Sequence, residues 1–426
     1  MEKKELFEKC LEFHISIDTR NILKNDVFIA LKGENFDGNL YCQQALANGA
    51  KFCISDDKCN ENLKDTFIVE NSLTFLQELA NYKRNKMDIP FIGITGSNGK
   101  TTNKELIHAV LSKKYSTSAT KGNLNNHIGV PLTILSIPKD TEIAIVEMGA
   151  NQPNDIIELA LIAEPNFGII TNIGAAHLEG FGNLEGVLNT KKQLFEYLSK
   201  SRENTIVCNG DDERVRNILP NVNIFYFGKG QDLKSNQVIA DPFLNFSYSY
   251  KDYHSPIIQT KLIGTYNINN FLAAISFGIL FKVPFEEINA ALTNYTPNNN
   301  RSQLEITAKN KLIVDCYNAN PTSMQAAIEN MIQIPGDNKL CILGDMLELG
   351  KESEREHAKI VSMIKDSNIP TYFIGKEFQK TLLNSKDAFE SSESLINSFN
   401  LDSIKDKIIL LKGSRGIQLE KLIEYL

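Results

Sequence analysis

Short apolar runs alternate along this chain with longer segments of helical period, and most of the runs end at Gly, Asn or Asp. Runs of this kind predict β-strands, and their alternation with helices is typical of α/β proteins with mostly parallel sheets. The expected strands lie at residues 27–31, 91–95, 143–146, 167–171, 206–208, 311–314, 340–343 and 408–411.

Polar residues gather directly after six of these strands. Because the carboxyl ends of parallel strands share one edge of a sheet, this many polar residues indicate a binding site there. The polar segments are residues 147–151, 172–177, 209–212, 315–321, 344–348 and 412–415.

The segment FIGITGSNGKTT, residues 91–102, carries the strongest single motif. In its loop, Gly96 and Gly99 free backbone N–H groups to face an anion. Lys100 adds a charge for the β- and γ-phosphates of a nucleotide, and Thr101 offers a hydroxyl to Mg²⁺. The residues predicted to contact the nucleotide phosphates are Thr95, Gly96, Ser97, Asn98, Gly99, Lys100, Thr101 and Thr102.

Two further features affect the interpretation of this loop. Residues 102–111 are compatible with a helix whose positive dipole end points at the same phosphates. The usual P-loop has a glycine five positions before Gly99, but this chain has Ile94 there. A plain glycine turn is the alternative, although a turn requires no Lys-Thr-Thr triplet.

Composition and charge exclude several classes of protein. Hydrophobic residues make up 42% and charged residues 23%, as in ordinary globular proteins. The formal net charge of -7 disfavours a nucleic-acid partner. The N-terminal sequence lacks the apolar core of a signal peptide, and no run approaches the ~18 apolar residues of a membrane span. The seven scattered cysteines are expected to be free thiols, so we expect a cytoplasmic protein without membrane insertion.

At 426 residues the chain exceeds what one hydrophobic core usually supports, so two or three domains are expected. Residues 81–90 are charged and lead into the glycine-loop strand, which favours a linker. Residues 295–302 contain Pro297 and three asparagines, which disfavour regular structure. These two breaks predict domains at residues 1–85, 86–296 and 297–426.

Motifs in all three predicted domains resemble those of the Mur ligases, ATP-dependent enzymes that form peptide bonds in peptidoglycan precursor synthesis. The short glycine loop with Ile94 is this family's own form. The motifs are DTR (18–20), FDG (36–38), TGSNGKTT (95–102), GNLNNHIGVP (122–131), EMGAN (147–151), NIGAAHLEGF (172–181), GTYNINN (264–270), YNANP (317–321) with Ser323 and Met324, GDMLELG (344–350) and KGSR (412–415).

The resemblance implies an α/β fold of three domains. These are a small N-terminal α/β domain for a UDP-sugar-peptide, a central P-loop domain with a mostly parallel sheet, and a C-terminal Rossmann-like domain for an incoming dipeptide. YNANP and GDMLELG resemble the member that joins D-alanyl-D-alanine to UDP-N-acetylmuramoyl-tripeptide. Such an enzyme phosphorylates the terminal carboxylate of the tripeptide with ATP, and the dipeptide amine then displaces phosphate. The chain is expected to use ATP and Mg²⁺ and to act as a monomer.

The expected catalytic residues are Lys100, Glu147, His177 and Lys191. Mg²⁺ prefers hard oxygen ligands, so Thr101 and Glu147 are the candidates for a first ion. The resemblance implies a second Mg²⁺ held by His177 and a carbamylated lysine, placed at Lys191 by register. Relatives usually have Gly-Glu after this lysine, whereas this chain has Lys-Gln, so Lys192 remains an alternative. Without the resemblance, two lysines on a helix are usually solvated.

The resemblance also implies contacts with the rest of ATP. Asn267 and Asn270 are candidates for adenine, because an amide can both donate to and accept from its N6/N7 edge. Asn267 is equally suited to cap a helix. Arg301 is expected to reach a phosphate when the third domain closes, and Asp315 is expected to meet the ribose.

The remaining candidates contact the substrates to be joined. By resemblance, the UDP end is contacted by Asp18, Thr19, Arg20 and Asp37, the tripeptide by Asn123, Asn125 and Asn126, and the dipeptide by Asn318, Asn320, Asp345 and Glu348. Arg20 is the natural charge partner of the diphosphate, and a carboxylate in the last group suits the ammonium of the dipeptide.

Two other functions fit parts of this pattern. One is a ligase of the same fold that adds a diamino acid or extends folate with glutamate, but YNANP and GDMLELG favour the D-alanyl-D-alanine reaction. The other is a P-loop switch or motor protein. That class needs an Asn-Lys-x-Asp base reader after the glycine loop or a repeat-built assembly. The Asn-Lys-Met-Asp string at residues 85–88 precedes the loop, and the sequence has no internal repeat.

Overall fold

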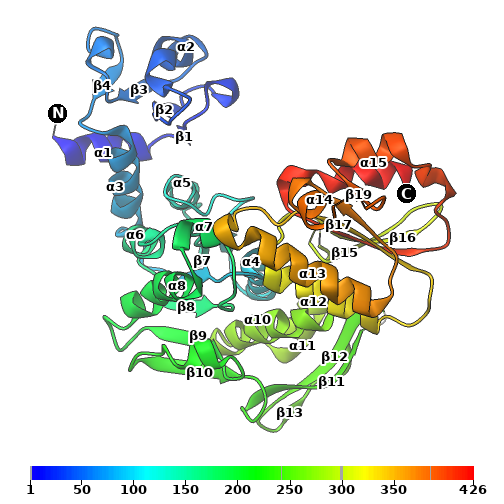
Figure 1. Ribbon diagram of the computed structural model, residues 1–426. Coiled ribbons are helices and arrows are strands. Elements are labelled where there is room, and N and C mark those ends of the chain that lie inside the picture. The colour runs from blue at the N-terminus through cyan, green and yellow to red at the C-terminus, as the bar shows by residue number, and fades with distance from the viewer. Residues whose placement is uncertain (1, 241, 298–300, 384) are drawn as a thin grey trace.

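The computed structural model describes residues 2–240, 242–297, 301–383 and 385–426, and its strands form three separate sheets (Figure 1). Helices alternate with strands, and most neighbouring strands are parallel, as the sequence pattern predicted. The P-loop strand and the six strands that precede polar segments are all present, each within one residue of its predicted bounds. Within the described residues, none of the helices has the length and apolar character needed to cross a lipid bilayer.

The first unit holds four parallel strands in the order β1-β2-β3-β4. Its elements are α1 (Lys3–Leu11), β1 (Ile15–Ser16), β2 (Val27–Ile29), α2 (Cys42–Ala47), β3 (Phe52–Ser55), β4 (Thr66–Ile68) and α3 (Ser72–Arg84). Phe7 of α1 and Phe75 of α3 meet edge to face, with ring centroids 5.1 Å apart, and join Ile54 of β3 in one buried cluster. Two helices therefore cover one face of this small sheet.

Helix α3 runs from the first sheet to the second unit (Figure 1). It continues through Arg84, so the prediction of a charged linker over residues 81–90 is wrong for its first half. The buried Arg84 guanidinium donates to the carbonyl oxygens of Ala163 and Glu164, at 2.9 Å each. It also lies 4.0 Å from the ring centroid of Phe91. The Arg84 guanidinium thus donates to carbonyl oxygens at the C-terminal end of the helix over residues 155–163 and does not face solvent.

The second unit has ten strands and eight α-helices in its described residues. The strands are β5 (Phe91–Thr95), β6 (Thr117–Ala119), β7 (Ile143–Glu147), β8 (Phe167–Ile170), β9 (Thr205–Asn209), β10 (Asn223–Phe227), β11 (Leu233–Ala240), β12 (Phe243–Tyr250), β13 (Tyr253–His254) and β14 (Ile258–Ile263). The helices are α4 (Lys100–Leu111), α5 (Gly129–Leu135), α6 (Asp155–Ala163), α7 (Leu178–Phe181), α8 (Leu184–Leu198), α9 (Glu213–Arg216), α10 (Ile268–Leu280) and α11 (Phe285–Asn294). Strands β8, β5 and β7 are adjacent and parallel, so the loops that follow them meet at one edge.

One side of this sheet was not predicted. Strands β11 to β14 pair in antiparallel fashion, and no strand was expected between residues 233 and 263. In β12 the buried residues Leu244, Phe246 and Tyr248 alternate with half-exposed ones. An antiparallel strand with one solvated face has no continuous apolar run. The predicted strands all rest on such runs, so these strands were missed.

The third unit has six strands in the order β15-β16-β20-β17-β18-β19, of which only the β15–β16 pair is antiparallel. Its elements are β15 (Gln303–Ile306), β16 (Lys311–Asp315), α12 (Pro321–Gln333), β17 (Lys339–Gly344), α13 (Ser353–Ser367), β18 (Thr371–Ile374), α14 (Lys376–Thr381), β19 (Ala388–Phe389), α15 (Ser392–Ser398) and β20 (Ile408–Lys412). Before it, α11 ends at Asn294, ahead of Pro297 as predicted, and residues 298–300 of that seam lie outside the described residues.

The second and third units pack against each other. They share a buried apolar cluster that includes Phe181 of α7 and Met346 after β17. At Gly174, an added Cβ would lie 2.7 Å from Thr322 Oγ1 of α12, so the backbone after β8 approaches this helix closely. The polar ends of two sheets are thereby brought together.

Candidate active site

The glycine loop follows β5 and leads into α4 as a compact turn. Gly99 has φ +79° and Gly96 has φ +151°, values that L side chains rarely adopt. An added Cβ at Gly96 would collide with Thr171 Oγ1, and one at Gly99 would lie 2.8 Å from Asn270 Oδ1. Helix α4 begins at Lys100, two residues before the predicted start. Crowding and backbone conformation together require glycine at both positions.

The segment after β8 anchors this loop. The backbone N–H groups of Ser97 and Asn98 donate to Asn172, to its carbonyl oxygen and its Oδ1 respectively, at 3.0 Å each. Thr171 Oγ1 and Asn172 Nδ2 both donate to the Asn98 carbonyl oxygen. Helix α4 has no side-chain cap within the described residues. The N–H groups of its first turn therefore remain the donors that an anion would meet.

Lys100 lies at the start of α4, with its Nζ 2.8 Å from the Gly96 carbonyl oxygen. Burial lowers the pKa of its ammonium group, Glu147 opposes this shift, and Arg301 adds to it. A positive side chain is thus held at the N-terminus of a helix, where anions are favoured.

Glu147 ends β7 and is buried beside the loop. Its Oε1 accepts from Thr101 Oγ1 at 3.1 Å and from Asn125 Nδ2 at 2.8 Å. Its Oε2 is also buried but has no hydrogen-bond partner among the described residues. Burying an unpaired carboxylate oxygen costs free energy, so this atom marks a place for a positively charged or hydrogen-bonding ligand.

His177 and Glu348 bring the second and third units into contact. His177 Nδ1 lies 2.5 Å from Glu348 Oε2, and this close approach of His177 lowers the pKa of Glu348. The backbone N–H of Glu179 donates to the Glu348 carbonyl oxygen at 3.1 Å. Both His177 and Glu348 have left-handed backbones, with φ of 51° and 64°. Two strained loops therefore meet at this point.

The neighbouring lysines of α8 face different surroundings. Lys191 is 1% exposed, and its Nζ lies 5.9 Å from the ring centroid of Phe181. Burial lowers the pKa of Lys191 well below its usual value, and the charge of Lys100 lowers it further. Lys192 is on the surface, where its Nζ pairs with Glu196 at 2.9 Å.

Three asparagines form a chain of amides beside the glycine loop. Asn103 Nδ2 donates to Asn270 Oδ1, and Asn270 Nδ2 donates to Asn267 Oδ1, at 2.7 Å each. Asn267 Nδ2 in turn donates to the Ile263 carbonyl oxygen at 2.7 Å. Asn267 occupies the N-cap position of α10 but makes no side-chain cap there, so the capping alternative is wrong. Asn103, which lies four residues after Gly99, was not predicted from the sequence to be a site residue.

The third unit adds charged and polar side chains. Asp315 pairs with the buried Lys412 at 3.0 Å, and Lys412 also donates to the Asn318 carbonyl oxygen. The Arg301 guanidinium stacks 3.9 Å from the ring centroid of Tyr317. Lys412 and Tyr317 lie within the KGSR and YNANP motifs, but no role for either was predicted from the sequence.

An amide pair joins the glycine loop to the third unit. Asn320 Nδ2 donates to Asn98 Oδ1 at 2.7 Å, and Asn320 Oδ1 also accepts from the Ser323 backbone N–H, which caps α12. The start of α12 is therefore fixed at the glycine loop.

A cavity of about 820 Å³ lies where these segments converge. The predicted site residues that line it are Ser97, Asn98, Gly99, Lys100, Thr102, Asn123, Asn125, Asn126, Glu147, His177, Asn267, Asn270, Arg301, Asp315, Asn318 and Glu348. Thr95, Gly96, Thr101, Lys191 and Asn320 are not among the lining residues. Thr101 and Asn320 are nevertheless hydrogen-bonded to residues that line the cavity, Thr101 to Glu147 and Asn320 to Asn98.

The residues predicted to bind the UDP end lie in the first unit and do not line this cavity. Asp18 accepts from the Arg20 backbone N–H and pairs with its guanidinium at 2.7 Å, which lowers the pKa of Asp18 to about 2. Thr19 begins the turn between them. Asp37 pairs with Lys32 at 3.0 Å, which lowers the pKa of Asp37. Asp18 and Asp37 therefore each form an ion pair with a nearby basic side chain of the first unit.

Asp345 also lies outside the cavity lining. Its buried carboxylate accepts from the backbone N–H groups of Glu377 and Phe378, at 2.8 and 2.9 Å. The predicted Asp345 carboxylate is therefore not presented to the cavity, because it is committed to the start of α14. Glu348, three residues later, is the carboxylate of this motif that reaches the cavity.

A P-loop at the edge of a mostly parallel sheet, faced by polar side chains of a further α/β unit, defines a multidomain nucleotide-binding enzyme. The Mur ligase middle domain matches residues 94–278, the glutamate ligase domain of Mur ligases residues 300–415, and the catalytic domain of the Mur ligase family residues 13–98. The chain belongs to the Mur ligase family and has its three-domain α/β fold.

Relatives that match this chain over nearly its full length include two enzymes of the same name. The UDP-N-acetylmuramoyl-tripeptide--D-alanyl-D-alanine ligase of Bacillus subtilis is 32% identical over 98% of this chain and 94% of its own length. The Escherichia coli enzyme of that name is 31% identical over 97% and 93%.

Solved structures agree over nearly the whole chain. The crystal structure of MurF from Acinetobacter baumannii superposes with a TM-score of 0.88 at 27% identity, covering 99% of this chain and 97% of that one. MurF ligase from Thermotoga maritima in complex with ADP gives 0.86 at 28% identity, covering 98% and 97%.

Proposed function

We propose that this chain is an ATP-dependent ligase that joins D-alanyl-D-alanine to UDP-N-acetylmuramoyl-tripeptide in peptidoglycan precursor synthesis. The observation that carries the proposal is the single cavity in which the glycine loop, Glu147 and the third-unit residue Glu348 converge. Joining a carboxylate to an amine through an acyl phosphate requires three molecules to meet in one space: ATP, the substrate with the carboxylate and the substrate with the amine. The name shared by the full-length relatives supports the same reaction.

The reaction needs activation, because a carboxylate does not react with an amine in water at useful rates. Phosphoryl transfer from ATP forms an acyl phosphate and ADP. The dipeptide amine then attacks the carbonyl carbon, the C–O bond to phosphate breaks, and the amine proton is lost. Lys100 and the open N–H groups of α4 would hold the phosphates in place and neutralise their charge.

For a first Mg²⁺ we propose Thr101 and Glu147. The fit rests on Glu147 Oε2, a buried oxygen without a hydrogen-bond partner among the described residues, beside the Thr101 hydroxyl. Hard oxygen donors of this kind suit Mg²⁺. When bound, the ion supplies charge neutralisation to the transferred phosphoryl group.

For a second Mg²⁺ we propose His177 and a carbamylated Lys191. Carbamylation joins a neutral amine to CO₂ with loss of one proton, and the lowered pKa of Lys191 favours that neutral form. Lys192 is disfavoured because its side chain is only partly buried and pairs with Glu196.

For the nucleoside we propose Asn267 and Asn270 at adenine, Asp315 at the ribose and Arg301 at a phosphate. All four line the cavity with the glycine loop. The amide chain that starts at Asn103 fixes how the two asparagines present their remaining donors.

For the acceptors we propose that Asn123, Asn125 and Asn126 contact the tripeptide and that Asn318 and Glu348 contact the dipeptide, since all five line the cavity. Asn320, bonded to Asn98, would act by fixing α12. Asp18, Thr19, Arg20 and Asp37 would hold the UDP end, which extends to the first unit.

We propose that the three functional domains are residues 1–85, 86–296 and 297–426, since each holds one of the three sheets. Use of ATP and the presence of seven free thiols support a cytoplasmic protein. We further propose that the protein acts as a monomer.

The test is phosphate release from ATP with UDP-N-acetylmuramoyl-tripeptide and D-alanyl-D-alanine, each omitted in turn. We expect release to require the tripeptide and product formation to require both substrates. Equal release without either substrate would contradict a ligase. Release supported by diaminopimelate or glutamate in place of the dipeptide would assign a different ligase of this family.

A further inference from the structure

The loop that carries Glu348 is held by side chains that the proposed reaction does not use. It follows β17 and comprises residues 345–350. Glu348 pairs with His177, and its carbonyl oxygen accepts from Glu179, so the loop extends from the third unit to the second. The position of its backbone sets where the Glu348 carboxylate lies in the cavity.

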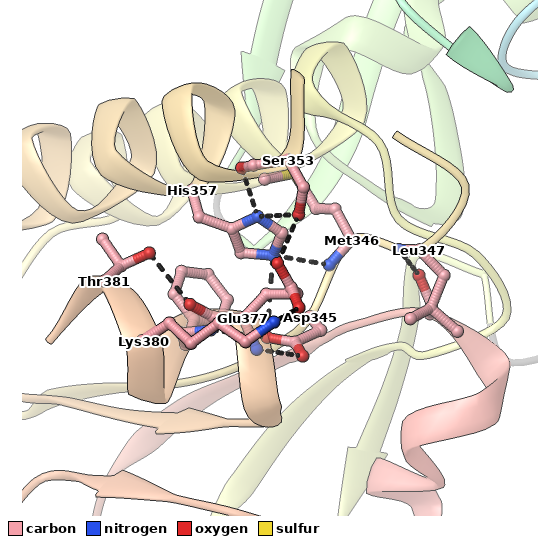
Figure 2. A network of polar contacts seen from close by, with 10 residues as sticks. Asp345, Met346, Leu347, Ser353, His357, Glu377, Lys380 and Thr381 are labelled. Carbon is pink, nitrogen blue, oxygen red and sulfur yellow. Dashed lines mark hydrogen bonds and ion pairs between the residues drawn. The ribbon is translucent and has the colours of Figure 1, made fainter. Parts of the chain in front are cut away.

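His357 lies directly behind this loop (Figure 2). Its side chain is 0% exposed, and its Nε2 accepts from the Met346 backbone N–H at 3.1 Å. On the other side of the ring, Nδ1 lies 2.7 Å from the Ser353 carbonyl oxygen, one turn earlier in α13. A carbonyl oxygen only accepts, so Nδ1 carries the proton and Nε2 is the acceptor.

The surroundings leave His357 little freedom. The ring of Phe378 meets it edge to face with centroids 4.6 Å apart. Ser353 Oγ donates to Glu377 Oε2 at 2.9 Å, and Glu377 pairs with Lys380 on the far side. Asp345 Oδ1, 3.6 Å from His357 Nε2, is held by the start of α14. The imidazole is therefore fixed in orientation and tautomer.

The next residue of the loop is held in a similar way. The Leu347 backbone N–H donates to Ser414 Oγ at 3.0 Å, and the Ser414 N–H donates to the Asp345 carbonyl oxygen. Two successive N–H groups beyond the end of β17, those of Met346 and Leu347, thus bond to side chains in place of a neighbouring strand. Without these acceptors the buried Met346 N–H would be unpaired, and the loop would shift to satisfy it.

We propose that His357 is a positioning residue for the ligase reaction, which fixes the loop so that Glu348 meets both His177 and the ammonium of the incoming dipeptide. This inference rests on the function proposed above. His357 itself does not line the cavity, so it would act through the loop and not on a substrate directly.

The test is a double-mutant cycle between His357→Leu and Glu348→Ala, read as the KM for D-alanyl-D-alanine. We expect His357→Leu alone to raise this KM by about tenfold to a hundredfold, since a displacement near 1 Å is enough for such losses. The KM for ATP should stay unchanged. In the Glu348→Ala background, His357→Leu should add less than about twofold, because it acts through the removed carboxylate. Additive effects would overturn the proposal.

Three variants separate positioning from general loss of stability. His357→Gln places an amide oxygen near the position of Nε2 and should restore the KM for the dipeptide. Ser414→Ala removes only the neighbouring bond and should raise the same KM by a smaller factor, which keeps the test open if His357→Leu does not fold. Ile360→Ala loosens the same helix without touching these hydrogen bonds and should leave the KM unchanged. An equal rise in Ile360→Ala would also overturn the proposal.

Failure of the proposed function gives a different result. If the wild-type protein makes no product from D-alanyl-D-alanine, the proposed substrate is wrong. If it makes product and His357→Leu leaves the KM for the dipeptide unchanged, only the positioning role is wrong.

Discussion

The glycine loop and the turns of the first unit are both proposed to bind ligand phosphates, yet they are built in opposite ways. At the glycine loop, Gly96 and Asn98 are fixed by Thr171 and Asn172, so the open helix donors are positioned before any ligand arrives. In the first unit, Arg20 is 85% exposed and its charge is paired with Asp18. Binding a diphosphate there requires exchanging one anion for another. Changes at the glycine loop should therefore affect kcat, and changes at Arg20 should affect KM.

The largest effect is expected from Lys100→Ala. Removing the charge at the start of α4 should lower kcat by about a thousandfold or more, because charge at the transferred phosphoryl group dominates such reactions. Steady-state phosphate release measures it, and thermal unfolding checks the fold. Lys113→Ala, just beyond the other end of the helix, is the matched control. Retained activity in Lys100→Ala would mean that the loop is only a turn.

A second substitution separates the two lysines of α8. Lys191→Met should lower activity by about a hundredfold if its carbamate is a metal ligand, whereas Lys192→Met should have little effect. Bicarbonate titration of the wild-type enzyme, followed by activity, measures the dependence on carbamylation. Equal losses in the two variants would contradict the assignment to Lys191.

Lys191→Met should also change stability. The folded-state pKa of Lys191 lies below its unfolded value, so the unfolded state binds more protons between these two pH values. In CO₂-free buffer, wild-type stability should rise with pH across that window, and Lys191→Met should remove the rise and be more stable at neutral pH. Denaturant unfolding at several pH values measures this. A wild-type stability that falls with pH there would contradict the burial argument.

A pair of glycine substitutions compares the two regions directly. Gly96→Ala should destabilise the protein by about 3 kcal/mol, because the new Cβ would collide with Thr171 in a strained backbone. Gly33→Ala, in the first unit with nothing near its Cβ, should stay within about 1 kcal/mol of wild type. Urea unfolding measures both. Equal stabilities would mean that the glycine loop can relax.

The smallest effect is expected from Arg20→Ala. It should raise the KM for the UDP-linked substrate by about tenfold, with kcat and stability nearly unchanged, since one charge-assisted hydrogen bond is lost and the Asp18 pair is exposed. Initial rates at varied substrate measure it, with the exposed Lys24→Ala as control. An unchanged KM would place the diphosphate elsewhere.

The sequence predicted best what depends on local pattern. The glycine loop and the strands β7, β8 and β20 follow from short apolar runs and fixed glycine spacing, which require no knowledge of packing. Among the antiparallel strands, β12 and β14 were missed because their buried residues alternate with more exposed ones, and β11 was missed because most of its residues are exposed.

Choices between neighbouring residues depended on tertiary structure. Lys191 and Lys192 differ by one position on a helix, and only packing decides which of them is buried. Asp345 and Glu348 share one motif, yet the start of α14 takes the carboxylate of Asp345 and leaves Glu348 for the cavity. The sequence alone does not distinguish such pairs.

Helix α3 has a mechanical consequence for the first unit. Besides Arg84, its Gln77, Asn81 and Lys83 side chains donate to backbone carbonyls of the second unit. The same helix buries Phe75 and Leu79 in the apolar cluster of the first sheet. A hinge between β4 and α3 would break that cluster, and a hinge near residue 85 would break the hydrogen bonds to the second unit. We therefore expect the first sheet, with the proposed UDP site, to move together with the nucleotide unit and not to swing away from it.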